Sequence, residues 1–295
     1  NPLSTSALAR PSKLFAIEEG LTHNQTGSYS KSNISKGLLQ GIMKSPIKDK
    51  PLRNPGQSLD QYLLDVVFDE GIIYILTGTF VCFYAFNNWI YYLTEKVPNP
   101  WAMTLIAVAV VAYCLYKIKK ALKKITKLKQ GRDGERAVGQ YLESLREQGV
   151  KVFHDLPGEN FNLDHVLVAL SGVYVIETKT YSKPDKGETR IIYTGDTLIH
   201  HNGFKDDKPL VQVKAGANWL KQLIKESTGR DIDVKKVGLF PGWFIEPTAE
   251  SKQSDVWVLN PKALPAFIAN SQKRLSVEDV SLVAYHLSRF VRTAD

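Results

Sequence analysis

Three charged side chains interrupt two otherwise apolar stretches near the middle of the chain. In the segment NLDHVLVALSGVYVIETKT (162–180), Asp164 precedes the first apolar run, and Glu177 and Lys179 follow the second. Carboxylates in apolar strands cost free energy unless they are paired or bind a metal. Two carboxylates and an amine suit phosphodiester hydrolysis with Mg²⁺, which binds few carboxylate oxygens and keeps waters, one of which becomes the nucleophile. We take Asp164, Glu177 and Lys179 as candidate catalytic residues, and the two carboxylates as candidate metal ligands.

A hairpin turn would bring these three side chains together. A two-residue turn at 171–172 (Ser-Gly) predicts a register in which Asp164 lies opposite Lys179. Glu177 then shares a face with Lys179 and lies diagonal to Asp164. His165 alternates away from Asp164, which favours a packed or hydrogen-bonded histidine over a metal ligand. The same spacing also fits a second interpretation, a cross-strand salt bridge on a half-exposed sheet.

Two helices flank the hairpin and offer further polar groups. Glu135, one turn into a predicted amphipathic helix at 133–148, could add an outer-shell carboxylate. Gln212, at the start of a predicted helix at 210–226, could hold a phosphate group or the lysine.

Residues from Gly131 onward have the pattern of a mixed α/β domain. Periodicity and turn signals predict helices at 133–148, 210–226, 261–270 and 276–291, and strands at 151–155, 162–170, 173–179, 188–199 (a hairpin), 237–245 and 256–259.

Three segments, GRDGERAVGQYLESL, NLDHVLVALSGVYVIETKT and PLVQVKAGANWLKQLI, closely resemble the nuclease-related domain (NERD), a branch of the PD-(D/E)xK nuclease superfamily. The resemblance covers roughly residues 131–259. It implies a restriction-endonuclease-like mixed sheet flanked by helices, and a nuclease dependent on Mg²⁺ or Mn²⁺. The family's motif positions correspond to Gly134, Glu135, Asn162, Asp164, His165, Glu177, Lys179 and Gln212.

Two apolar stretches precede this domain. Residues 72–93 include no charged side chain and would span roughly 33 Å as a helix. A second stretch covers about 101–118, and the short segment between them holds two prolines, which indicates a tight reversal. These stretches predict a transmembrane hairpin, with a buried hairpin in a soluble protein as the alternative.

Charge divides the chain and predicts its orientation. The net charge is +8, and all of the excess lies in residues 1–130, whereas residues 131–295 carry 22 basic and 22 acidic side chains. Seven lysines fall within 117–129, directly after the second apolar stretch, and such an excess marks the cytoplasmic side. The expectation is a multi-pass protein of the bacterial inner membrane with both termini in the cytoplasm.

The expected organisation therefore has three parts. Residues 1–60 are a flexible or partner-ordered segment, residues 61–130 hold the hairpin and a Lys-rich juxtamembrane helix, and residues 131–295 form the nuclease-like domain with C-terminal helices. The expected function is a membrane-anchored nuclease that cleaves DNA, in preference to RNA. The alternative is a non-catalytic membrane assembly component, a homo-oligomer or part of a membrane protein complex, that uses the fold to bind nucleic acid or protein.

Overall fold

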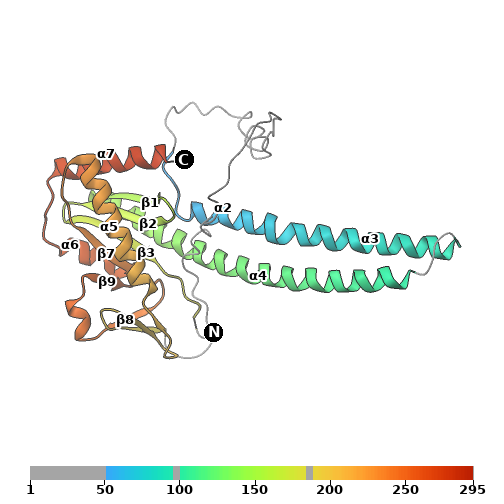
Figure 1. Cartoon of the computed structure of the whole chain (residues 1–295). Helices are drawn as coiled ribbons and strands as arrows, with labels where there is room; N and C mark the ends of the chain where they lie inside the picture. The colour runs from blue at the N-terminus through green and yellow to red at the C-terminus, as the bar shows by residue number, and fades with distance from the viewer. Residues whose placement is uncertain (1–50, 96–99, 184–188, 295) are drawn as a thin grey trace, which may run out of the picture.

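The computed structural model describes residues 51–95, 100–183 and 189–294 (Figure 1). A long helical hairpin projects from an α/β domain. Most of the segment expected to be flexible, residues 1–50, lies outside the described residues. Its last part, residues 51–60, contacts the α/β domain and leads into the first helix of the hairpin.

The first arm of the hairpin is helical throughout. It consists of α2 (Gln57–Val66), a π-helical stretch η1 (Val67–Ile72) and α3 (Ile73–Leu93). The second arm is α4 (Trp101–Glu143), which lies alongside the first (Figure 1). Within the described residues, two helical runs, Gln57–Leu93 and Trp101–Gln148, are long and apolar enough to cross a membrane.

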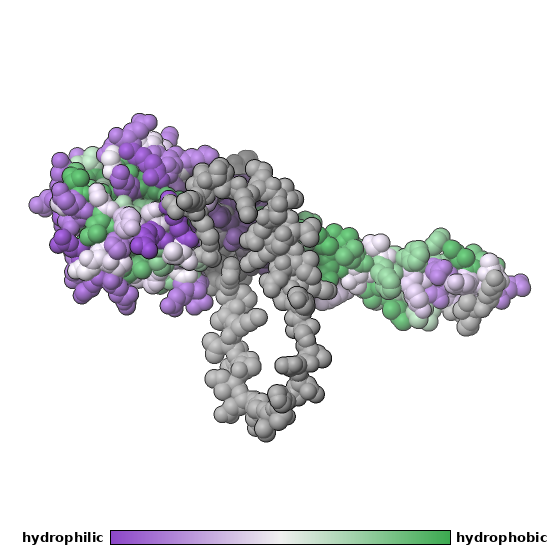
Figure 2. Space-filling model, turned by 90° about the horizontal axis from the view of Figure 1, so that it is seen from above, coloured by the Kyte–Doolittle hydropathy of each residue, from purple (hydrophilic) through white to green (hydrophobic). Residues whose placement is uncertain are grey.

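The apolar side chains of this hairpin face outward. Only 6% and 11% of the two most apolar stretches are buried, and Figure 2 shows apolar residues along the visible surface of the projecting hairpin. Large exposed side chains include Phe80, Phe83 and Leu105. A hairpin in the core of a soluble protein would bury such residues, so this exposure argues against the alternative of a buried hairpin.

Helix α4 is longer than the sequence predicts. Separate helices were expected for the second apolar stretch and for residues 133–148, but α4 runs without interruption from the first into the second. The reason is a buried stripe with seven-residue spacing that keeps one face of the helix packed along its length. Its members are Ala107, Cys114, Ala121, Leu128, Glu135 and Leu142. Glu135 is thus a carboxylate in a stripe of small and apolar side chains.

The main sheet has five strands in the order β1-β2-β3-β7-β9. The first three pair antiparallel, whereas β3, β7 and β9 pair parallel. The strands are β1 (Lys151–Pro157), β2 (Asn162–Ala169), β3 (Gly172–Thr178), β7 (Val234–Leu239) and β9 (Val256–Leu259).

Helices cover both faces of this sheet. The end of α4 and α6 (Leu264–Ala269) pack on one face, where Leu142 and Leu264 share a core with Ile176. Helices α5 (Lys208–Thr228) and α7 (Val277–Thr293) pack on the other, where Leu220 and Val283 share a core with Val175. This arrangement confirms the expected mixed α/β fold with flanking helices, preceded by two long apolar helices.

A second, four-stranded sheet has the order β6-β5-β4-β8. The hairpin predicted within 188–199 is confirmed by the pairing of β4 and β5, but the single strand expected at 237–245 is wrong. The chain turns at Gly242, which has a φ of 78°, and β8 then joins the second sheet. The strands of this sheet are β4 (Arg190–Tyr193), β5 (Leu198–His200), β6 (Lys205–Asp206) and β8 (Phe244–Pro247). Short 3-10 helices elsewhere in the domain are η2 (Ser144–Gln148), η3 (Glu250–Gln253) and η4 (Pro261–Ala263).

A close approach at Gly134 fixes α4 against the chain that follows β3. A Cβ atom at Gly134 would lie 1.8 Å from Oγ1 of Thr180, so Gly134→Ala should lower the free energy of unfolding by about 1–3 kcal/mol. The matched control is Gly71→Ala, where a Cβ would meet nothing within 4 Å and alanine favours the helix. Urea unfolding of the full chain in detergent measures both. Equal stability of the two variants would contradict the packing described here.

Candidate active site

Asp164 and Glu177 lie at the ends of β2 and β3 that are remote from the hairpin turn. The turn occupies residues 170–171, so Ala169 pairs with Gly172 and the predicted register is wrong by one position on each strand. Extending the observed register puts Asp164 opposite Glu177 rather than opposite Lys179. Asp164 Oδ2 also accepts a hydrogen bond of 2.7 Å from the backbone N–H of Thr178, which ties the two strand ends together.

Lys179 follows β3 and forms a buried ion pair with Glu177. Its Nζ lies 2.5 Å from Glu177 Oε1, and the two side chains are only 4% and 12% exposed. The backbone N–H of Lys179 donates to the carbonyl of Leu239 at 2.9 Å, which extends the β3–β7 pairing to this residue. The central parallel pair of strands therefore holds the lysine in place.

Glu135 adds a third carboxylate from α4. It is 5% exposed, and its Oε1 accepts a 2.8 Å hydrogen bond from the backbone N–H of Gly56. Burial, followed by the negative charge of Asp155 and a smaller contribution from Glu177, raises the pKa of Glu135 to about 8, against the opposing effects of the Gly56 N–H and Lys179.

The pKa of Asp164 is shifted by neighbouring charges of the same cluster. Burial raises its pKa well above the ordinary value, and the charges of Glu177 and Glu135 add to this, whereas Lys179 and the Thr178 N–H oppose it. The structure thus brings together Glu135, Asp164, Glu177 and Lys179, four of the five residues singled out from the sequence.

Gln212, the fifth, lies near the start of α5. Its Oε1 is buried, and within the described residues it has no hydrogen-bond partner. No hydrogen bond or ion pair in the described part of the chain joins Gln212 to the carboxylates.

Asp155 is a further buried carboxylate near the site, and it is not among the residues predicted from the sequence. It lies in β1 with a φ of 49° and is 1% exposed. Its oxygens accept from Arg53 Nη1 at 3.1 Å, from the Ser58 N–H at 3.0 Å and from the Ser58 hydroxyl at 2.5 Å. Burial raises its pKa, and these donors oppose the rise. Asp155 could have been found from the sequence, because it lies beside apolar residues of a predicted strand, as Asp164 does.

His165 is a packed, hydrogen-bonded histidine, as predicted. It is fully buried, and its Nδ1 lies 2.8 Å from Nδ1 of His154, whose Nε2 lies 2.7 Å from Glu143 Oε1. Burial holds the pKa of His165 well below its usual range, and the ring serves the packing between β1, β2 and α4.

The donor set suits a hard divalent cation. Among the residues that the structure describes, no group of three or more His, Cys, Asp or Glu side chains is arranged as a metal site. Mg²⁺ is nevertheless commonly held by one or two carboxylates together with water and substrate phosphates. Asp164 and Glu177 supply two such carboxylates, and their oxygens match that preference.

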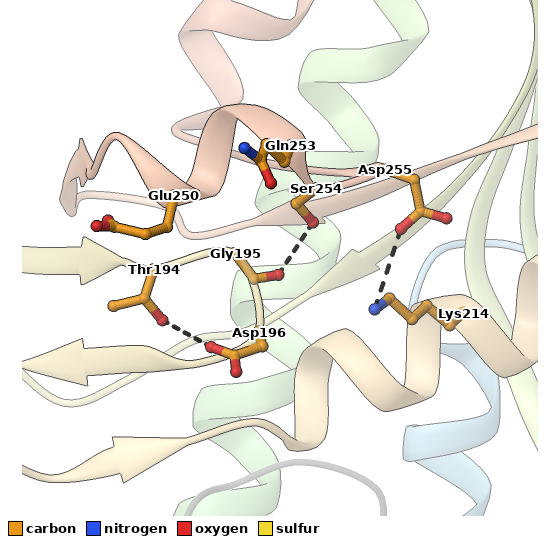
Figure 3. A pocket seen from close by; sticks show the side chains of 8 residues that line it. All are labelled: Thr194, Gly195, Asp196, Lys214, Glu250, Gln253, Ser254 and Asp255. Atoms are coloured by element: carbon orange, nitrogen blue, oxygen red, sulfur yellow. Dashed lines mark hydrogen bonds and ion pairs between the residues drawn. The ribbon is translucent and has the colours of Figure 1, made fainter.

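A separate open depression lies between the second sheet and α5, away from these residues (Figure 3). Its lining is polar and of mixed charge, with Lys214 and Asp255 4.0 Å apart. None of the four clustered residues lines it.

The raised pKa of Glu135 makes stability depend on pH. Because the folded pKa of about 8 exceeds the ordinary 4.5, its contribution is fully present below pH 4.5 and is lost as the pH rises through 8. Glu135→Gln keeps the Gly56 hydrogen bond without the charge. We compare the free energy of unfolding of the variant with that of the parent chain, with a chelator present. The difference, variant minus parent, should be larger at pH 9 than at pH 4 by at least about 1 kcal/mol. Urea unfolding at both pH values measures this, and an equal difference at both would contradict it.

The comparisons with known proteins agree with the geometry. Residues 130–241 match the family model of the nuclease-related domain, NERD. The match begins within α4 and ends just after β7, and it includes the four clustered residues and Gln212. No curated protein and no solved structure matches the chain significantly. Residues 130–241 of this chain therefore form a nuclease-related domain.

Proposed function

We propose that this chain is a membrane-anchored, metal-dependent nuclease that hydrolyses phosphodiester bonds of DNA, in preference to RNA, on the cytoplasmic side of the membrane. The observation that carries the proposal is the cluster of Asp164, Glu177, Lys179 and Glu135 inside the nuclease-related domain.

The proposed cation is Mg²⁺ or Mn²⁺, held by Asp164 and Glu177. Support comes from the crowding of negative charge, because Glu177 and Glu135 both raise the pKa of Asp164 and a bound cation would relieve that repulsion. When bound, the cation supplies an activated water and neutralises charge on the phosphoryl oxygens.

The remaining roles follow from charge and position. Lys179 holds the Glu177 carboxylate through their ion pair, and its ammonium offsets negative charge that develops on the phosphoryl group. Glu135 serves as an outer-shell carboxylate, held by the Gly56 N–H. Gln212, with a buried amide oxygen that lacks a partner among the described residues, is proposed to contact a phosphate group or the lysine.

The proposed anchor is the helical hairpin. Its apolar side chains are exposed along both arms, and seven lysines follow the second apolar stretch between residues 117 and 129. Lysine-rich flanks stay in the cytoplasm and contact anionic lipids. We infer a bacterial inner-membrane protein with two spans and with both termini in the cytoplasm.

Substitutions in the cluster test the enzyme activity. Asp164→Asn, Glu177→Gln and Lys179→Met should each lower Mg²⁺-dependent cleavage of DNA by about 100-fold or more in the purified full chain, because the first two remove a charged ligand of the cation and the third removes the ammonium that offsets charge on the phosphoryl group. Cleavage of end-labelled DNA with added Mg²⁺, Mn²⁺ or chelator measures this. Asp255→Asn and Lys214→Met change the same residue types in the depression of Figure 3 and should leave the rate unchanged.

Two observations favour a second candidate, a non-catalytic assembly component that binds nucleic acid or protein. Lys179 and Glu177 already form a closed ion pair, and residues 131–295 carry no net excess of basic side chains for contacts to phosphates. A parent chain that cleaves neither DNA nor RNA with any of these metals, yet purifies as a stable oligomer or complex, would establish this candidate instead.

Cysteine labelling tests the topology. In a chain whose Cys82 and Cys114 are replaced by serine, Thr94→Cys introduces a thiol at the exposed end of α3, and Ser281→Cys introduces one on the exposed face of α7. In intact bacterial spheroplasts, a membrane-impermeant maleimide should label the cysteine at 94 and leave the one at 281 unlabelled until the membrane is permeabilised. The reverse pattern would contradict the proposed orientation.

A further inference from the structure

The short segment that leads into α2, together with the first two residues of that helix, contacts the candidate site. Residues 53–58 (RNPGQS), here called the hairpin lead, pass beside α4 and β1 at the base of the helical hairpin, where α2 lies alongside α4 (Figure 1). The lead lies outside the segment matched by the family model, and nothing in its sequence indicates a part in catalysis.

The lead supplies the donors for two buried carboxylates. The backbone N–H of Gly56 donates to Glu135 at 2.8 Å, and Arg53 and Ser58 donate to Asp155. Within the described residues, every hydrogen bond to these two carboxylates comes from the lead. Buried carboxylates are costly without such donors, so the lead determines where both groups settle.

The fit between the lead and the domain is close. A Cβ atom at Gly139 of α4 would lie 2.4 Å from Cγ of Pro55, so only glycine allows this approach. Gly56 has a φ of 68°, which favours glycine and aims its N–H at Glu135. Two further ion pairs, from Asp60 to Arg132 and to Arg136, fasten the first turn of α2 to the same face of α4.

The contacts support the site and leave its central groups free of the lead. In the described part of the chain, no hydrogen bond or ion pair joins the lead to Asp164, Glu177 or Lys179. Arg53 lies 3.1 Å from Asp155 and offsets a charge that otherwise acts on Glu135. The lead thus orients the carboxylate of Glu135, and its Arg53 offsets the negative charge of Asp155. It makes no hydrogen bond or ion pair with the two proposed metal ligands among the described residues.

We propose that the hairpin lead is a positioning element of the nuclease site, through which the two arms of the membrane hairpin set the orientation of Glu135. This inference rests on the proposed nuclease function. Glu135 belongs to α4, which is continuous with the second apolar span, and Gly56 directly precedes α2, which is continuous with the first. A shift between the two arms therefore changes the contact between Gly56 and Glu135.

The test uses the full chain in lipid nanodiscs. The double variant Arg53→Gln/Ser58→Ala removes both side chains that bind Asp155, whereas Asp60→Asn weakens the attachment of α2 without touching either carboxylate. DNA cleavage gives kcat, KM and the Mg²⁺ concentration for half-maximal rate. Thermal unfolding and size-exclusion chromatography monitor the fold, and Ser58→Thr tests rescue by a retained hydroxyl.

The double variant should lower kcat by about tenfold or more, since a displaced group near the reacting centre costs up to about 100-fold. Its KM for DNA should stay within about twofold of the parent value, because the lead does not contact the proposed substrate site. Asp60→Asn and Ser58→Thr should keep a kcat within about twofold of the parent. If the double variant does not fold, the single variant Ser58→Ala replaces it, and it should lower kcat by a smaller factor with KM unchanged.

Four results would overturn the inference. An active parent with unchanged kcat in folded lead variants would do so and leave the nuclease function standing. Faster cleavage by those variants would show that the lead restrains the site instead of positioning it. If Asp60→Asn lost as much kcat as the double variant, the effect would come from the attachment of α2 to α4 alone, and not from the contacts with Asp155. A parent chain that cleaves no nucleic acid removes the proposed function and this inference together.

Discussion

The repulsion among clustered, buried or half-buried carboxylates, balanced by one ammonium group, is the constraint that shapes this domain. The charge of Glu177 raises the pKa of both Asp164 and Glu135, the charge of Glu135 raises that of Asp164 further, and Lys179 opposes these shifts. Such a cluster is expensive in a folded chain that gains nothing from it, because apolar residues would pack the same space at lower free energy. The surrounding structure supplies the compensation, through the backbone N–H groups of Thr178 and Gly56 and through the central parallel strands.

The apolar helical hairpin and the nuclease-related domain form a continuous structure. The stripe that α4 buries passes from small side chains in the apolar span, such as Ala107, through Leu128 to Glu135 and then to Leu142 in the domain core. A carboxylate in that stripe ties the position of the site to the position of the hairpin. The second arm of the hairpin therefore contributes Glu135 to the candidate site.

Much of the fold and most of the site were predictable from sequence, because they depend on local patterns. Alternating apolar residues predicted β2 and β3, and the break in that pattern at Asp164 and Glu177 singled out the carboxylates. The register was wrong because serine and glycine at 171–172 are typical turn residues, yet the turn uses Leu170 and Ser171. The shift moves the partner of Asp164 by two residues, from Lys179 to Glu177, so the side chains stay on the same face of the sheet and still meet. Contacts of long range were not predictable: neither the donors to Asp155 nor the continuity of α4 past Gly131 has a local signal.

Anomalous diffraction from crystals soaked in Mn²⁺ would show whether Asp164 and Glu177 bind a divalent cation. We expect a peak between the carboxylates of Asp164 and Glu177, with metal–oxygen distances of about 2.0–2.2 Å and Lys179 retained beside them. A structure at saturating Mn²⁺ with no peak there, and with Glu177 still closed on Lys179, would contradict the claim that this cluster holds a catalytic cation.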